Sequence, residues 1–159
     1  MKKFLKIVFI LFFIILVLII GIISYWIYKP SYNAEDFGIQ TIKSCTDKDG
    51  DGIDDYSDIL LGAKAEAERK PEYRSAYYAG GYPPVTEGVC TDVIWRALKD
   101  AGYLLKEMVD EDIAQNVETY SRVNGKPEPN IDFRRVPNLK AYFERNHISL
   151  TIDLSKIEE

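Results

Sequence analysis

The sequence has very few of the residues that bind transition metals or form disulfides. Of its 159 residues, one is histidine (His147) and two are cysteine (Cys45 and Cys90). A single histidine excludes a metal site built on two histidines of one chain, and two cysteines cannot supply a four-cysteine zinc cluster. The same cysteine count excludes a small domain held together by several disulfides.

The sequence also lacks a run of basic residues. The net charge is −5, but the first 29 residues contribute only lysines, four in number, so the remainder carries 16 basic and 25 acidic residues, a net −9. Nucleic-acid-binding domains cluster Lys and Arg to neutralise phosphates. We therefore exclude nucleic acid as a partner.

One long hydrophobic run lies at the N-terminus. The 22 residues from Ile7 to Tyr28 carry no charge, which is long enough to cross a hydrocarbon core of about 30 Å. Aromatic residues suited to the lipid–water interface end the run, and no Ala-x-Ala cleavage pattern follows. Three lysines precede the run and one follows it, which keeps the N-terminus in the cytoplasm. The sequence predicts a single-pass anchor over residues 1–29, with the lipid bilayer as a partner and everything after Pro30 outside the cytoplasm.

The remaining part, about 130 residues, is enough for one modest domain. We predict a stalk with an acidic loop over residues 30–58 and a domain over residues 59–159. Hydrophobic spacing predicts helices over residues 58–70, 90–101, 105–120 and 136–145. Alternation predicts a strand over residues 147–154. The fold class expected is α+β, rich in helix.

Residues 47–58 match the template of a calcium-binding loop. Acidic residues occupy positions one, three, five, nine and twelve, Gly52 lies at position six, and position seven offers a backbone carbonyl. The candidate ligands are Asp47, Asp49, Asp51, Ile53, Asp55 and Asp58. Position twelve departs from the template, because Asp replaces the longer Glu. The alternative is a solvated Asp/Gly turn that caps the following helix. Calcium, if bound, is expected to be structural.

Cys90 is predicted to lie where a loop enters a helix. The partial positive charge at a helix N-terminus stabilises a thiolate, the nucleophilic form of cysteine. The free backbone N–H groups there also suit an oxyanion hole. A buried structural thiol and a disulfide with Cys45 are the alternatives that the residues alone leave open.

Several longer motifs extend around this cysteine. They are YYAGGYPP at residues 77–84, GVCTDVIWRA at 88–97, VDEDI at 109–113 and NIDFRRVPNL at 130–139. In this order they closely resemble a bacterial family, domain of unknown function 1287 (DUF1287), over roughly residues 50–154. Residues 52–63 also look like the opening of its Gram-positive members. The family is similar to NlpC/P60-type, papain-like cysteine hydrolases, which cut peptide bonds of cell-wall peptidoglycan.

This resemblance implies roles for particular residues. Cys90 would be the catalytic nucleophile, with Asp92 a cleft residue. Asp132, Arg134 and Arg135 would line or brace the cleft. No cofactor would be needed for catalysis, and peptidoglycan peptides would be partners.

The resemblance also implies a catalytic histidine, because such a thiol needs a base. Family members carry it further along the chain, in a motif that begins His-Ile-Gly. His147 is followed by Ile148 and Ser149 at a helix end, so the base role is not carried over to it. We expect the chain to hold the helical half of the hydrolase domain with its sheet largely missing, truncated before the catalytic histidine and inactive by itself.

Three functions follow as hypotheses for a protein of the bacterial cell membrane. The first is a membrane-anchored, extracytoplasmic protein of the cell-wall cysteine hydrolase type. The second is a non-catalytic wall-facing binding or structural protein. The third is a calcium-stabilised module with a Cys45–Cys90 disulfide.

Overall fold

The computed structural model describes residues 2–28, 32, 35–38 and 40–150. The chain divides into two compact units, Met1–Thr41 and Ile42–Glu159. The first unit contains the helix α1 (Lys2–Ile27) and a short 3-10 helix, Glu35–Phe37. Within α1, Phe4–Tyr25 is long and apolar enough to cross a membrane, and the most apolar stretch of this segment is not buried. A signal sequence near the N-terminus has the same properties, so the structure supports a membrane span or a signal sequence.

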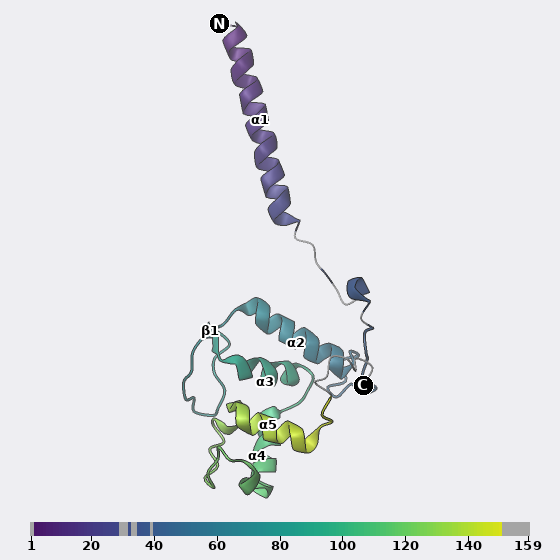
Figure 1. The fold of residues 1–159 in the computed structure, drawn as a ribbon, viewed down its shortest axis with the longest axis vertical. Coiled ribbons are helices and arrows are strands. Elements are labelled where there is room, and N and C mark those ends of the chain that lie inside the picture. Colours follow the sequence, from purple (N-terminus) through teal and green to yellow (C-terminus); the bar gives the residue numbers. More distant parts are fainter. Residues whose placement is uncertain (1, 29–31, 33–34, 39, 151–159) are drawn as a thin grey trace. The chain divides into compact units, whose positions relative to one another are not determined.

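The second unit is mostly helical (Figure 1). Its α-helices are α2 (Asp55–Arg69), α3 (Cys90–Asp100), α4 (Leu105–Gln115) and α5 (Val136–Asn146). Short 3-10 helices cover Val117–Thr119 and Asp132–Arg134. The strands β1 (Glu72–Tyr73) and β2 (Glu87–Gly88) pair in parallel, with Glu72 opposite Glu87 and Tyr73 opposite Gly88. The α+β prediction is thus confirmed in coarse form, as helices with one very small sheet.

The hydrophobic core lies between α3, α4, α5 and the turn at residues 132–134. Its buried members are Trp95, Leu105, Val109, Ile113, Tyr120, Val123, Phe133, Leu139 and Tyr142. Tyr82 closes one side, with its ring centroid 4.8 Å from that of Trp95 and 5.2 Å from that of Phe133. The core therefore fixes the turn at residues 132–134 against α3.

The helix α2 packs along α3 without burying large apolar side chains (Figure 1). Its buried residues are Asp55, Asp58, Gly62 and Glu66. A Cβ on Gly62 would lie 3.0 Å from the Cα of Ala97 and 2.7 Å from an Oδ2 atom of Asp100. A side chain at this position would push the two helices apart, so glycine allows the close approach.

Two helices have different boundaries in the structure from those predicted, and local polar contacts explain the differences. The helix α2 begins at Asp55 rather than 58, because Asp54 caps it and accepts hydrogen bonds from the N–H (3.3 Å) and the hydroxyl (2.6 Å) of Ser57. The helix α4 ends at Gln115 rather than 120. The Asn116 side chain donates to the carbonyl of Asp112 (3.1 Å), the acceptor that a further helical turn would use.

The predicted strand over residues 147–154 is not formed over residues 148–150. Residues 151–154 lie outside the described part of the chain. The paired strands β1 and β2 were not predicted, since neither has an alternating hydrophobic pattern.

Candidate functional site

Cys90 is the first residue of α3, and its side chain is exposed. Strand β2 leads directly into it through Val89, which is extended (φ −124°, ψ 175°). The N–H of Val89 donates to Oδ2 of Asp92 at 2.7 Å. This bond, from the N-cap backbone to the side chain of the third helical residue, fixes the first turn of α3.

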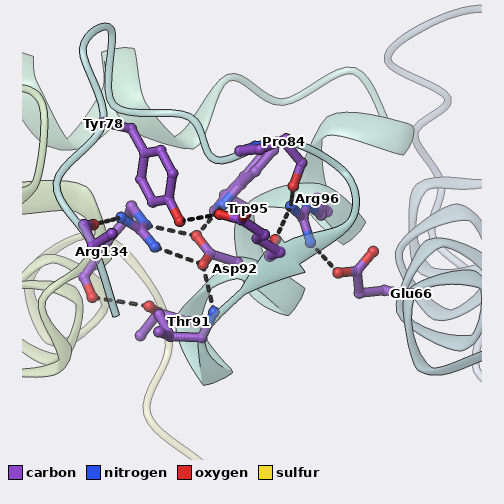
Figure 2. A network of polar contacts seen from close by, with 11 residues as sticks. Glu66, Tyr78, Pro84, Thr91, Asp92, Trp95, Arg96 and Arg134 are labelled. Atoms are coloured by element: carbon purple, nitrogen blue, oxygen red, sulfur yellow. Dashed lines mark hydrogen bonds and ion pairs between the residues drawn. The ribbon is translucent and has the colours of Figure 1, made fainter. Parts of the chain in front are cut away.

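Asp92 is fully buried and paired with Arg134 (Figure 2). Nε of Arg134 donates to Oδ1 of Asp92 at 2.7 Å, and Nη2 donates to Oδ2 at 2.8 Å. Such a two-point contact fixes both the distance and the plane of the pair. Nε1 of Trp95 adds a third donor to Oδ1 at 2.7 Å. Together with the Val89 N–H, the carboxylate accepts four hydrogen bonds.

Further contacts hold Arg134 in place from three directions. Its Nη1 donates to the carbonyl of Ala76 at 3.1 Å, and its guanidinium lies 5.2 Å from the ring centroid of Tyr78. The Thr91 hydroxyl donates to the Arg134 carbonyl at 2.9 Å. Residues 76–78, the head of α3 and the turn at 132–134 are thereby joined around one ion pair.

The electrostatics keep Asp92 ionised. Burial raises its pKa, but the hydrogen bonds from Arg134, Trp95 and Val89 together with the Arg134 charge outweigh burial, so the pKa lies below its ordinary value of 3.8. A carboxylate whose pKa is lower in the folded state than in the unfolded state stabilises the fold when the pH is above the unfolded-state pKa. This contribution is lost as the pH falls through the folded-state pKa. The pair should therefore be intact at neutral pH and lost in strong acid.

Asp132 and Arg135 form a second pair beside the first. Nη1 of Arg135 donates to Oδ1 of the buried Asp132 at 2.7 Å, and Nη2 donates to Glu128 at 2.6 Å. The backbone N–H of Glu128 donates to Oδ2 of Asp132 at 2.6 Å. Asp92, Asp132 and Arg134 are buried and Arg135 is half-buried, and their contacts hold the turn at residues 132–134 against the head of α3.

A third buried pair was not foreseen from the sequence. Arg96 pairs with Glu66 of α2 and donates through Nη2 to the carbonyls of Pro84 (3.0 Å) and Glu87 (2.8 Å) (Figure 2). An arginine in the middle of a helix, between the apolar residues Trp95 and Ala97, is a sequence signal that could have indicated a buried partner. Glu66 gave none, since its partner is 30 residues away.

Cys45 and His147 do not lie with Cys90. Both cysteines are exposed free thiols in the structure, so the disulfide alternative is not seen there. His147 follows α5, with its ring 5.2 Å from that of Phe143 and 5.7 Å from that of Tyr142. The start of α5 adjoins Arg134 and the head of α3, and its 11 residues are about 16 Å long. His147 is therefore at the C-terminal end of α5, whereas the N-terminal end of α5 adjoins Arg134, which pairs with Asp92 of α3.

The acidic loop forms a separate cluster. The carboxylates of Asp47, Asp49 and Asp51 offer oxygens that all lie within 4.8 Å of one another, and all three residues are exposed. Asp55 and Asp58 are buried in the first turn of α2. Ile53 lies in the loop between the two groups.

The arrangement around Cys90 offers an accessible thiol on a rigid helix head, which suits nucleophilic chemistry. The model of the family described as Domain of unknown function (DUF1287) matches residues 60–158 of the chain. The chain belongs to the DUF1287 family. The matched residues include Cys90 and all three of these ion pairs, whereas the acidic loop lies before them.

A relative of this DUF1287 chain is the uncharacterized protein YijF of Escherichia coli (strain K12). The two are 42% identical over 78 residues, which make up 48% of this chain and 38% of YijF. The chain thus spans well under half the length of that relative. No solved structure matches the present chain.

Proposed function

We propose that this DUF1287 chain carries the nucleophile of an extracytoplasmic cysteine hydrolase that cuts peptide bonds of the bacterial cell wall. The observation that supports it best is the exposed thiol of Cys90 at the first position of α3, above a helix turn held by the buried Asp92–Arg134 pair. The resemblance of the family to NlpC/P60-type enzymes supplies the substrate class.

The chemistry follows from the helix terminus. Cys90 is the first residue of α3, and the N–H groups at the start of a helix carry partial positive charge and can bind an anion. In the proposed reaction the sulfur attacks the peptide carbonyl, and the same N–H groups stabilise the oxygen anion that forms. The C–N bond then breaks, the amine leaves with the proton that the general base took from the thiol, and the acyl group remains on Cys90 as a thioester. Water hydrolyses this thioester to a carboxylic acid and regenerates the thiol, and neither step needs a metal or organic cofactor.

Asp92 and Arg134 act here as positioning residues. They fix the orientation of the first turn and therefore the direction of the Cys90 side chain. Asp132 and Arg135 hold the neighbouring turn, from which the Arg134 side chain extends. A shift of the helix head would move the thiol relative to a bound peptide, and misplacement of about 1 Å can cost roughly a hundredfold in rate.

We do not assign the general base to His147, which lies at the C-terminal end of α5, because the N-terminal end is the one that adjoins Arg134. We assign the base to the histidine segment that the longer family members carry beyond the region matched here. The 159 residues alone should then present a reactive thiol without turnover.

We also propose that α1 is an uncleaved anchor, with the N-terminus in the cytoplasm and the second unit outside. The span of Phe4–Tyr25 and the lysines before it support this orientation. N-terminal sequencing of protein purified from membranes should then give a sequence that starts at Met1 or Lys2. A sequence that begins near residue 30 would show that α1 is a signal sequence instead.

The nucleophile can be tested with iodoacetamide on the full chain in detergent near neutral pH. Cys45 is the matched control, because it is equally an exposed free thiol but lies outside a helix terminus. We expect Cys90 to react faster than Cys45 by a factor of about three or more. Mass spectrometry of Cys45→Ser and Cys90→Ser variants measures each rate separately, and equal rates would remove the support for a nucleophile.

The substrate class can be tested in the same reaction. Purified wall peptides should slow alkylation of Cys90 and leave Cys45 unaffected, whereas a scrambled peptide should protect neither. Protection of Cys90 without enhanced reactivity would instead favour a wall-binding protein. Absence of protection at millimolar peptide would argue against wall peptides as ligands.

A further inference from the structure

The acidic loop before α2 brings three carboxylates to one point. Asp47 accepts hydrogen bonds from the N–H groups of Gly50 (2.7 Å) and Gly52 (2.9 Å), and Asp51 accepts one from Ile53 (2.8 Å). Gly52 has a φ of +96°, which side chains rarely adopt, so glycine permits this turn. The backbone thus holds like charges together that would otherwise repel each other.

Asp58 provides an independent observation. It is only 7% exposed, and its Oδ2 atom is buried without a hydrogen-bond partner among the described residues. A buried carboxyl group with one oxygen unpaired, in the same twelve-residue segment (47–58) as three clustered carboxylates, is costly unless a cation compensates it.

Helix capping does not account for this group. Asp54 is the N-cap of α2. Asp55, which the sequence placed among the ligands, is engaged elsewhere: its oxygens accept bonds from the Tyr103 hydroxyl (2.6 Å), the Thr46 hydroxyl (2.5 Å) and the N–H of Lys48 (2.8 Å). Asp55 thus has three donors among the described residues, whereas Oδ2 of Asp58 has none.

We propose that the carboxylates of Asp47, Asp49, Asp51 and Asp58, with the carbonyl of Ile53, bind one calcium ion. All are hard oxygen donors on a loop that can adjust to six or more ligands, which suits calcium better than magnesium with its strict octahedral geometry. The site lies before the matched family region and does not depend on the chemistry of Cys90.

The loop is seated on the turn between α3 and α4. A Cβ on Gly102 would lie 3.1 Å from that of Asp49, and Tyr103 bonds to Asp55 and stacks under Lys48, whose Nζ is 5.2 Å from the ring centroid. An ion that orders the loop therefore also stabilises the contact between α2 and the end of α3. Calcium should accordingly raise the thermal stability of the second unit.

Calorimetric titration of the full chain in detergent with CaCl₂ tests the site, with MgCl₂ as the comparison. We expect one calcium site with a Kd on the order of 10⁻⁴–10⁻³ M. Asp51→Asn and Asp58→Asn should each weaken binding about tenfold or more, because both remove a charged ligand. Glu68→Gln, an exposed carboxylate on α2, is the matched control and should bind as the natural chain does.

Thermal unfolding tests the site in a second way, because Asp58→Asn should change the unfolding temperature differently with and without calcium. In EDTA, Asp58→Asn should unfold at a higher temperature than the natural chain, because it removes a buried charge, but calcium should no longer raise that temperature. Asp51→Asn, at an exposed position, keeps the test valid if the buried variant fails to fold. The proposal is overturned if calcium gives no binding heat, if magnesium binds equally tightly, or if Asp51→Asn binds calcium as the natural chain does.

Discussion

Replacing Arg134 by alanine should lower the free energy of unfolding by about 3–5 kcal/mol, because it leaves a buried carboxylate without its countercharge. Asp92 has no access to solvent, and Arg134 supplies two of its four hydrogen bonds. The loss should be read from denaturant unfolding, followed by the fluorescence of Trp95, whose indole donates to the same carboxylate.

Arg74→Ala is the matched control for this prediction. Arg74 also pairs with a carboxylate, Glu87 at 2.9 Å, but its side chain is 60% exposed. An exposed pair of this kind contributes at most about 1 kcal/mol. If Arg134→Ala costs no more than Arg74→Ala, the pair at the head of α3 is not the brace that we describe.

Extending the chain should convert a reactive thiol into a catalyst. The 159 residues should release no measurable peptide from purified peptidoglycan, since their one histidine, His147, lies at the C-terminal end of α5 and packs on Phe143 and Tyr142. A chimera that continues from Glu159 into the C-terminal remainder of YijF should release peptides, detected by mass spectrometry. Cys90→Ala in that chimera should reduce the rate by a factor on the order of 10⁴ or more, because the nucleophile and its base act as a unit.

His147→Ala separates the two candidate bases in the same assay. The chimera with this change should keep its activity, because His147 packs on Phe143 and Tyr142 instead of lying near the thiol. Cleavage by the 159-residue chain that is lost in His147→Ala would contradict this assignment and restore His147 as the base.

The sequence allowed the helices and the position of Cys90 to be predicted, because both depend on local signals. Hydrophobic spacing placed α3 and α5 to within about a residue, and the loop-to-helix transition placed Cys90 at a helix start. The interior of α3 was predicted less well. The apolar Ile94 is 38% exposed, while the charged Asp92 and Arg96 are buried. Burial of charged residues could not be predicted, since the partners are Arg134, 42 residues away, and Glu66, 30 residues away.

The acidic loop shows a similar division. The Asp/Gly spacing predicted the cluster of Asp47, Asp49 and Asp51, because each contact within it spans a few residues. The hydrogen bond from the Tyr103 hydroxyl to Asp55 could not be predicted, because the two residues are 48 positions apart in the sequence. In the same way, β1 and β2 are each two residues long and pair across a connection whose path no local pattern reveals.

The central claim, that Cys90 is the nucleophile toward wall peptides, is tested most directly by trapping its thioester. The chimera would be mixed with wall peptides, quenched in acid within the first turnover and digested with trypsin, and the fragments weighed. We predict an added acyl mass on the fragment of residues 75–96, which contains Cys90, and none on the fragment of residues 44–48, which contains Cys45. Peptide release by the Cys90→Ala chimera at an undiminished rate, or an acyl group on another residue, would contradict the account.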